Sequence, residues 1–154
     1  MIQLIYISLI SAIFLSITAW MKFRKKRLLF DNRYGMTISM SSASIISLIL
    51  SMQFSFVSPF PFDVTLGLAA LSGILIGAAF GCLVRLHAVL SGIFSGATGG
   101  LMGAMSGSVI KDPSLCGLPM DTASVLQFNM LTFTAFGTAI LFVTIGLILY
   151  SLKV

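Results

Sequence analysis

Charged side chains are scarce in this 154-residue chain. Asp, Glu, Lys and Arg together make up 8% of it, and only 4 of these residues are acidic. An average soluble domain is about 25% charged, so a soluble fold of this length would lack the polar surface that it needs. The hydrophobic content of 58% and the mean hydropathy of +1.10 instead fit an integral membrane protein with little mass outside the bilayer.

Side chains that commonly carry catalysis are also scarce. His87 is the one histidine, and the sequence holds no Ser-His-Asp set, no paired carboxylates and no phosphate-binding loop. The apolar segments contain no Asp, Glu, Lys or Arg away from their ends, whereas proton-coupled carriers and many pumps place a carboxylate within the membrane. The sequence therefore predicts that the protein is not an enzyme and has no catalytic residues.

The basic residues are concentrated in one place. The formal net charge is +5, but six of the nine Lys and Arg residues lie between Lys22 and Arg33. They are not spread over a surface that nucleic acid could contact, so we expect no nucleic-acid partner. A basic cluster directly after an apolar segment instead indicates how the chain is oriented in a membrane.

Five apolar segments are each long enough to cross a bilayer, which takes about 20 helical residues. They lie at about 2–21, 36–57, 64–84, 88–110 and 124–150. No separate soluble domain is visible between or around them. The predicted fold class is therefore all-α: one polytopic transmembrane domain over residues 1–154, built as a helical bundle with about five spanning helices.

The loops alternate in charge, which predicts the orientation of the bundle. The basic cluster at 22–33 indicates a cytoplasmic loop, while the loop at 58–63 has no Lys or Arg and is expected outside. Arg85 returns the chain to the cytoplasmic side, the loop at 111–121 has one Lys against two Asp, and Lys153 follows the last segment. We expect the N-terminus outside and the C-terminus inside.

Small residues recur at every fourth position in four successive segments. Such a row makes a flat helix face that lets another backbone come close in a membrane, although each glycine weakens a helix in water by about 1 kcal/mol relative to alanine. In the fourth segment six glycines fall within a stripe about 100° wide. We expect tight helix packing, as in a glycine zipper, at Gly73, Gly77, Gly81, Gly92, Gly96, Gly99, Gly100, Gly103, Gly107, Ser39, Ala43, Ser47 and Ser51.

A few polar side chains inside or beside the segments have structural explanations. Asp63 is placed to cap the N-terminus of the third segment. Gln53, Gln127 and Asn129 are the strongest uncharged polar groups in or beside the spans. We expect these amides to hydrogen-bond between helices, with the alternative that Gln53 lines a path for a solute.

Soft metal ligands are the main positive sign of chemistry. The chain has nine Met and two Cys, and thioethers and thiolates favour Cu(I). The candidate metal ligands are Met36, Met40, Met102, Met105 and Cys82. Packing is the alternative explanation, because Met also fills irregular apolar gaps. Met102 lies beside the glycine stripe and Met105 nearly opposite it, so one helix does not bring these two into one site.

Two families share short motifs with the chain. The stretch 66–110, with Gly-Gly-Leu-Met-Gly-Ala-Met at 99–105, resembles small Gly- and Met-rich membrane proteins of Gram-positive bacteria, which implies a bacterial plasma membrane location and no particular function. Met36 and Met40 in the second segment, with Gly-x-x-x-Gly in the third, resemble the eukaryotic copper-uptake transporters. Those transporters have three spans and a Met-rich outer tail, and their Met pair lies towards the outside rather than at the cytoplasmic end.

Two functions remain open at this stage. The first is a small, tightly packed membrane protein that forms a homo-oligomer or serves as a subunit or accessory of a membrane assembly, with the lipid bilayer and other membrane proteins as partners. The second is a channel or carrier for a soft metal ion such as copper, or for a small solute. The first needs no cofactor, whereas the second would use the Met and Cys candidates.

Overall fold

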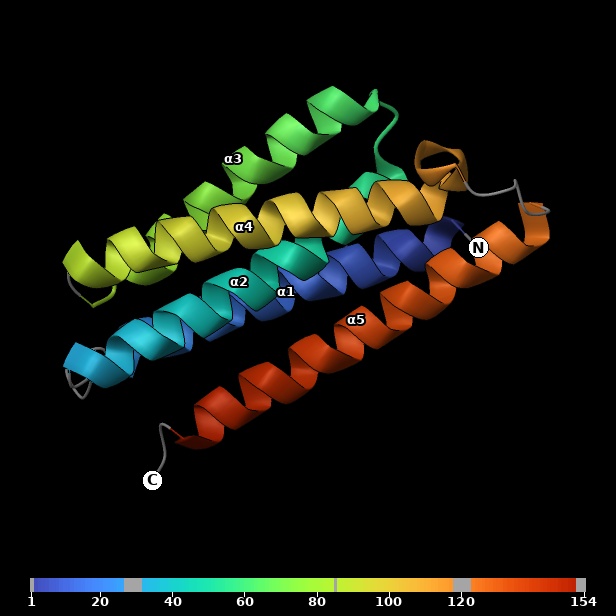
Figure 1. Ribbon diagram of the computed structural model, residues 1–154. Helices are drawn as coiled ribbons and strands as arrows, with labels where there is room; N and C mark the ends of the chain where they lie inside the picture. The colour runs from blue at the N-terminus through green and yellow to red at the C-terminus, as the bar shows by residue number, and fades with distance from the viewer. Residues whose placement is uncertain (1, 27–31, 85, 118–122, 152–154) are drawn as a thin grey trace.

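The computed structural model describes residues 2–26, 32–84, 86–117 and 123–151, and over these residues it is a helical bundle without strands (Figure 1). Five long helices correspond to the five predicted segments, and each is long and apolar enough to cross a membrane. The predicted all-α, polytopic fold class is therefore confirmed. The elements are α1 (Ile2–Lys26), α2 (Asn32–Val57), α3 (Phe62–Gly81), α4 (Leu86–Lys111), a short 3-10 helix η2 (Pro113–Cys116) and α5 (Ala123–Ser151).

Helix ends differ from the predicted segment ends where charged residues continue a helix. α1 passes the predicted end at 21 and reaches Lys26, and α2 begins at Asn32 rather than 36. Lys and Arg are good helix formers, so a helix can continue through them. The hydropathy pattern therefore indicates the part of the helix that lies within the membrane and not where the helix ends. Arg85, Lys153 and the middle of the basic cluster lie outside the described residues, and the predicted orientation stays a prediction.

The cap of α3 also differs from the prediction. Asp63 was expected to cap this helix, but the N-cap is Pro61, whose backbone is extended and whose side chain forms no capping hydrogen bond. The helix therefore begins at Phe62, and Asp63 lies within its first turn. There its carboxylate stabilises the positive end of the helix dipole instead of accepting an N-cap hydrogen bond.

The five helices run alternately up and down. Figure 1 shows α2 and α4 running in one direction and α1, α3 and α5 in the other, with the start of α1 and the end of α5 at opposite ends of the bundle. α4 packs most extensively against α2 and α3, while α2 also contacts α1 and α5. α2, α3 and α4 thus form a close-packed three-helix unit, with α1 and α5 added beside α2.

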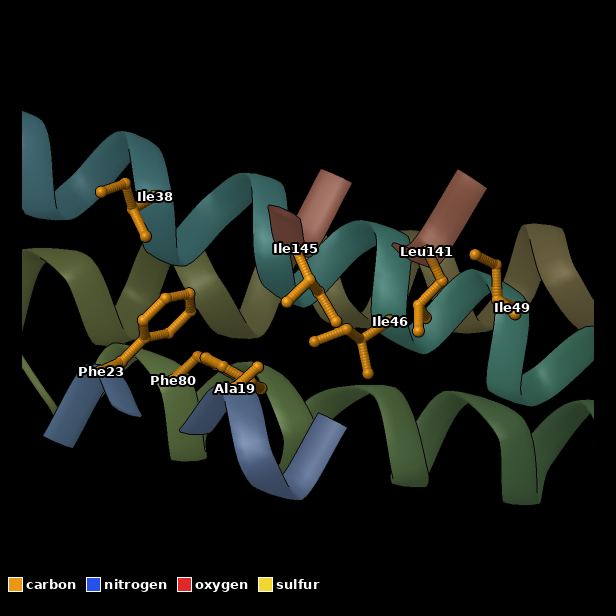
Figure 2. Close-up of a cluster of buried hydrophobic side chains, with 8 residues drawn as sticks. All are labelled: Ala19, Phe23, Ile38, Ile46, Ile49, Phe80, Leu141 and Ile145. Atoms are coloured by element: carbon orange, nitrogen blue, oxygen red, sulfur yellow. The ribbon is translucent and has the colours of Figure 1, made fainter. Parts of the chain in front are cut away.

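The main apolar core lies where α2 meets α1, α3 and α5. Figure 2 shows its side chains converging from α1, α2, α3 and α5. Ile46 of α2 and Leu141 of α5 are almost completely buried, and the rings of Phe23 and Phe80 meet edge to face at 5.9 Å between centroids. These contacts hold α1 and α5 against the three-helix unit. The full cluster is Ala19, Phe23, Ile38, Ile46, Ile49, Phe80, Leu141 and Ile145.

Candidate functional site

The glycines of α4 contact two different helices. Gly92 and Gly96 face Gly77 and Gly73 of α3, and Gly100 faces the backbone of Ala69. We call this contact the α3–α4 seam. A methyl group added at any of these five glycines would lie less than 3.0 Å from a backbone atom across the seam. The two backbones are therefore in direct contact, with no space for a side chain between them.

The second glycine row of α4 faces α2. Gly99 lies against Ser44 and Ser47, and Gly103 lies against Ser51 and the Leu48 carbonyl. Gly107 continues the row at Met52 and Ser55, and we call this contact the α2–α4 seam. Successive residues of a helix are 100° apart, so neighbours such as Gly99 and Gly100 point at different partner helices. The single predicted stripe thus serves two seams within one chain.

The serine row of α2 contributes few hydrogen bonds across the α2–α4 seam. Ser47 and Ser51 donate to carbonyls of their own helix, at 3.1 Å to Ser44 and 2.6 Å to Ser47. Ser39 donates to the Ala88 carbonyl of α4 at 3.2 Å, and Ala43 is fully buried. Ser47 and Ser51 act chiefly by being small, because their hydroxyls are satisfied within α2 and leave α4 room to approach.

The candidate metal ligands come from α2, α4 and the C-cap of α3. Met36, Met40, Met102, Met105 and Cys82 are all exposed. Met36 lines a shallow groove with His87, at one end of α4. Met102 lies fifteen residues farther along α4, which places it about 22 Å from His87 along the helix axis. Among the described residues no group of three or more His, Cys, Asp or Glu side chains is arranged to hold a metal ion.

A cavity lined by both apolar and polar side chains lies at the opposite end of the three-helix unit from His87. Its volume is about 500 Å³, and it opens between the end of α2, the start of α3, the end of α4, η2 and α5. We call it the end cavity because of this position. Charged, hydroxyl and aromatic side chains meet in it. Its walls are formed by Ser55, Phe60, Pro61, Phe62, Thr65, Ser108, Lys111, Asp112, Pro113, Leu115 and Leu126.

The polar groups of the end cavity are held by a connected set of hydrogen bonds. The hydroxyls of Ser55 and Ser108 pair across the α2–α4 seam at 2.9 Å, and those of Ser58 and Thr65 pair at 3.1 Å. The Lys111 ammonium donates to the Ser58 carbonyl at 2.5 Å and to the Ser55 carbonyl at 3.5 Å. It therefore satisfies carbonyls in the last turn of α2 and directly after it, where the helix dipole favours a positive charge.

The side chain of Gln53 contradicts one expectation from the sequence. It is fully buried, and neither its amide nitrogen nor its amide oxygen has a hydrogen-bond partner among the described residues. The predicted hydrogen bond from Gln53 to a neighbouring helix is therefore wrong. Gln53 does not line the end cavity either. A buried amide without a partner costs stability, since it loses water and gains nothing in exchange.

The sequence did not single out the residues of the end cavity. Lys111 and Asp112 were counted only as loop charges, and Ser108 and Thr65 belong to no predicted row. Their spacing along the chain carries no signal, because the cavity forms only when the ends of several helices meet. The one usable sign is that four apolar segments end or begin near 57, 62, 111 and 125, at the same end of the bundle.

Comparison with known proteins returns nothing to set beside these features: no family model, no curated protein and no solved structure matches the chain. The resemblances to Gram-positive membrane proteins and to copper transporters stay predictions, as does the bacterial plasma membrane location. The fold itself supports the coarser statement. The chain is a small helical bundle with five candidate membrane spans.

Proposed function

We propose that this protein is a non-catalytic subunit of a membrane assembly, formed with copies of itself or with another membrane protein. The observation that carries the proposal is the unequal burial of its helices. Within the apolar windows, 56% of the residues of α2 are buried, against 11% in α1 and 22% in α5. A close-packed three-helix unit is thus flanked by two helices whose surfaces are left largely for lipid or for partner helices.

The surface that would meet a partner is not the glycine surface. All the predicted glycines of α4 are occupied by α2 and α3 of the same chain, so a variant such as Gly96→Leu with Gly103→Leu would disturb the single bundle before it disturbed an assembly. α5 instead presents four phenylalanine rings outward. The exposed rings are those of Phe128, Phe133, Phe136 and Phe142.

The assembly is tested by cross-linking in the native membrane. With the natural cysteines replaced by serine, Phe136→Cys on α5 is expected to yield disulfide-linked dimers or adducts with a second membrane protein. The matched control is Leu75→Cys, which is similarly exposed and is expected to stay uncross-linked. It belongs to α3, which lies at the opposite edge of the bundle from α5 (Figure 1). Equal cross-linking at both positions, or none at either together with a monomeric mass in mild detergent, would overturn the proposal.

Transport of a soft metal ion is the second candidate. It is favoured by one observation: Met36 and His87 line the same groove, and both side chains can bind Cu(I). The purified protein is then expected to retain Cu(I), and Met36→Leu to reduce the retained copper severalfold, while Met102→Leu leaves it unchanged. Absence of retained copper in the unmodified protein would remove this function.

A further inference from the structure

We propose that the end cavity binds the headgroup of a zwitterionic phospholipid, with the lipid phosphate at Lys111 and the lipid ammonium at Asp112. This binding site is independent of the proposed role as an assembly subunit. Its volume of about 500 Å³ falls in the range of small-molecule sites, about 300 to 1,000 Å³. The argument rests on the charges, the walls and the position of the cavity.

The cavity carries two charged side chains of opposite sign that do not pair with each other. Lys111 and Asp112 both line it, and within the described residues no ion pair joins them. The Lys111 ammonium has three N–H donors, of which two go to the carbonyls of Ser55 in α2 and of Ser58 directly after it. Asp112 uses its Oδ1 to accept from the backbone N–H and the hydroxyl of Ser114, which leaves Oδ2 available. One N–H of Lys111 and the Oδ2 of Asp112 are thus available to a ligand that carries both charges.

Hydroxyl groups extend the phosphate side of the proposed site. Ser55, Ser108 and Thr65 form part of the wall beside Lys111, and their side chains are buried. Either hydroxyl of the Ser55–Ser108 pair can be the donor, so one of the two hydrogens can turn towards a new acceptor, whereas Thr65 already donates to the Phe60 and Pro61 carbonyls. An ammonium together with hydroxyl donors suits a phosphate oxygen, for which lysine is a common partner.

The walls and the position of the cavity favour a lipid over a soluble zwitterion. Phe60, Phe62, Leu115 and Leu126 supply apolar surface beside the charged groups, and Phe60 and Leu115 are themselves about half exposed. Four candidate spans end or begin here, at Val57, Phe62, Lys111 and Val125. This is the depth at which lipid headgroups lie. A bound phospholipid can keep its chains in the bilayer while its headgroup enters the cavity.

The test measures the thermal stability of the whole chain in phosphate-free detergent, with each added lipid compared with lipid-free protein. Phosphatidylethanolamine at about 100 times its Kd is expected to raise Tm by on the order of 5 °C. Phosphatidylglycerol, which lacks the ammonium, is expected to raise it less, and diacylglycerol, which lacks the phosphate, not at all. Soluble glycerophosphoethanolamine alone is expected to give no shift. An equal shift with diacylglycerol, or with the soluble headgroup, would overturn the proposal.

Variants separate the two charges and guard against a loss of folding. Lys111→Met should abolish the shift with both phospholipids, and Asp112→Asn should remove the preference for phosphatidylethanolamine. Leu126→Trp fills the cavity without touching a charged group and should also abolish the shift. Lys25→Met, at an exposed lysine of α1, is the matched control and should keep it. Each shift is taken from the variant's own lipid-free Tm, and an undiminished shift in both Lys111→Met and Leu126→Trp would contradict the site.

Discussion

Gly77→Ala is expected to destabilise the bundle by about 1 to 3 kcal/mol or more, whereas Gly67→Ala in the same helix should be neutral or slightly stabilising. The new methyl group at Gly77 would lie 2.6 Å from the backbone carbon of Gly92, and also against the carbonyl oxygen of that residue. Backbone atoms cannot move aside as a flexible side chain can, so α3 and α4 must separate. Overpacking of this kind typically costs about 1 to 3 kcal/mol.

The matched control isolates this clash from helix propensity. A methyl group at Gly67 meets no atom within 4 Å, and alanine favours a helix over glycine by up to about 1 kcal/mol. Both variants lie in α3 and make the same chemical change, so their difference reports the α3–α4 seam alone. The free energies of unfolding are measured by denaturant titration in detergent micelles. Equal stability of the two variants would show that the backbones are farther apart than the seam requires.

The existence of these seams was predictable from sequence, but their partners were not. Four-residue spacing of small residues, as at Gly73, Gly77 and Gly81, indicates a close helix contact through simple helix geometry. That spacing does not indicate which helix packs against each face. Gly99 and Gly100 are adjacent in sequence and fall in the same predicted stripe, yet they contact α2 and α3 respectively. The division depends on how three helices cross, which is a property of the whole bundle.

The hydrogen bonds of the end cavity, unlike the existence of the seams, could not be predicted from the sequence. Lys111 caps carbonyls of Ser55 and Ser58 that lie more than fifty residues earlier in the chain. Neither its neighbours in sequence nor the apolar period of α4 points to that contact. Hydropathy places the lysine at the end of a span and assigns it to topology, which is the only use that a single sequence supports. Its role at the cavity follows from the meeting of the ends of α2 and α4.

Gln53→Met is expected to stabilise the protein by about 1 to 3 kcal/mol. The amide of Gln53 is fully buried and has no partner among the described residues, so the folded state bears the cost of removing it from water without a hydrogen bond in return. Methionine has nearly the same length and shape and no polar amide, which keeps the packing unchanged and removes that cost.

A second glutamine provides the control for this gain. Gln127 of α5 is exposed, so Gln127→Met removes an amide that is not buried and should change the free energy of unfolding by less than about 0.5 kcal/mol. Both variants are compared with the unmodified protein by denaturant titration in the same detergent. Should Gln53→Met instead lose stability by 1 kcal/mol or more, the amide must be satisfied in the folded protein by a water or a bound solute. The sequence-based alternative that Gln53 lines a solute path would then be favoured over a simple packing role.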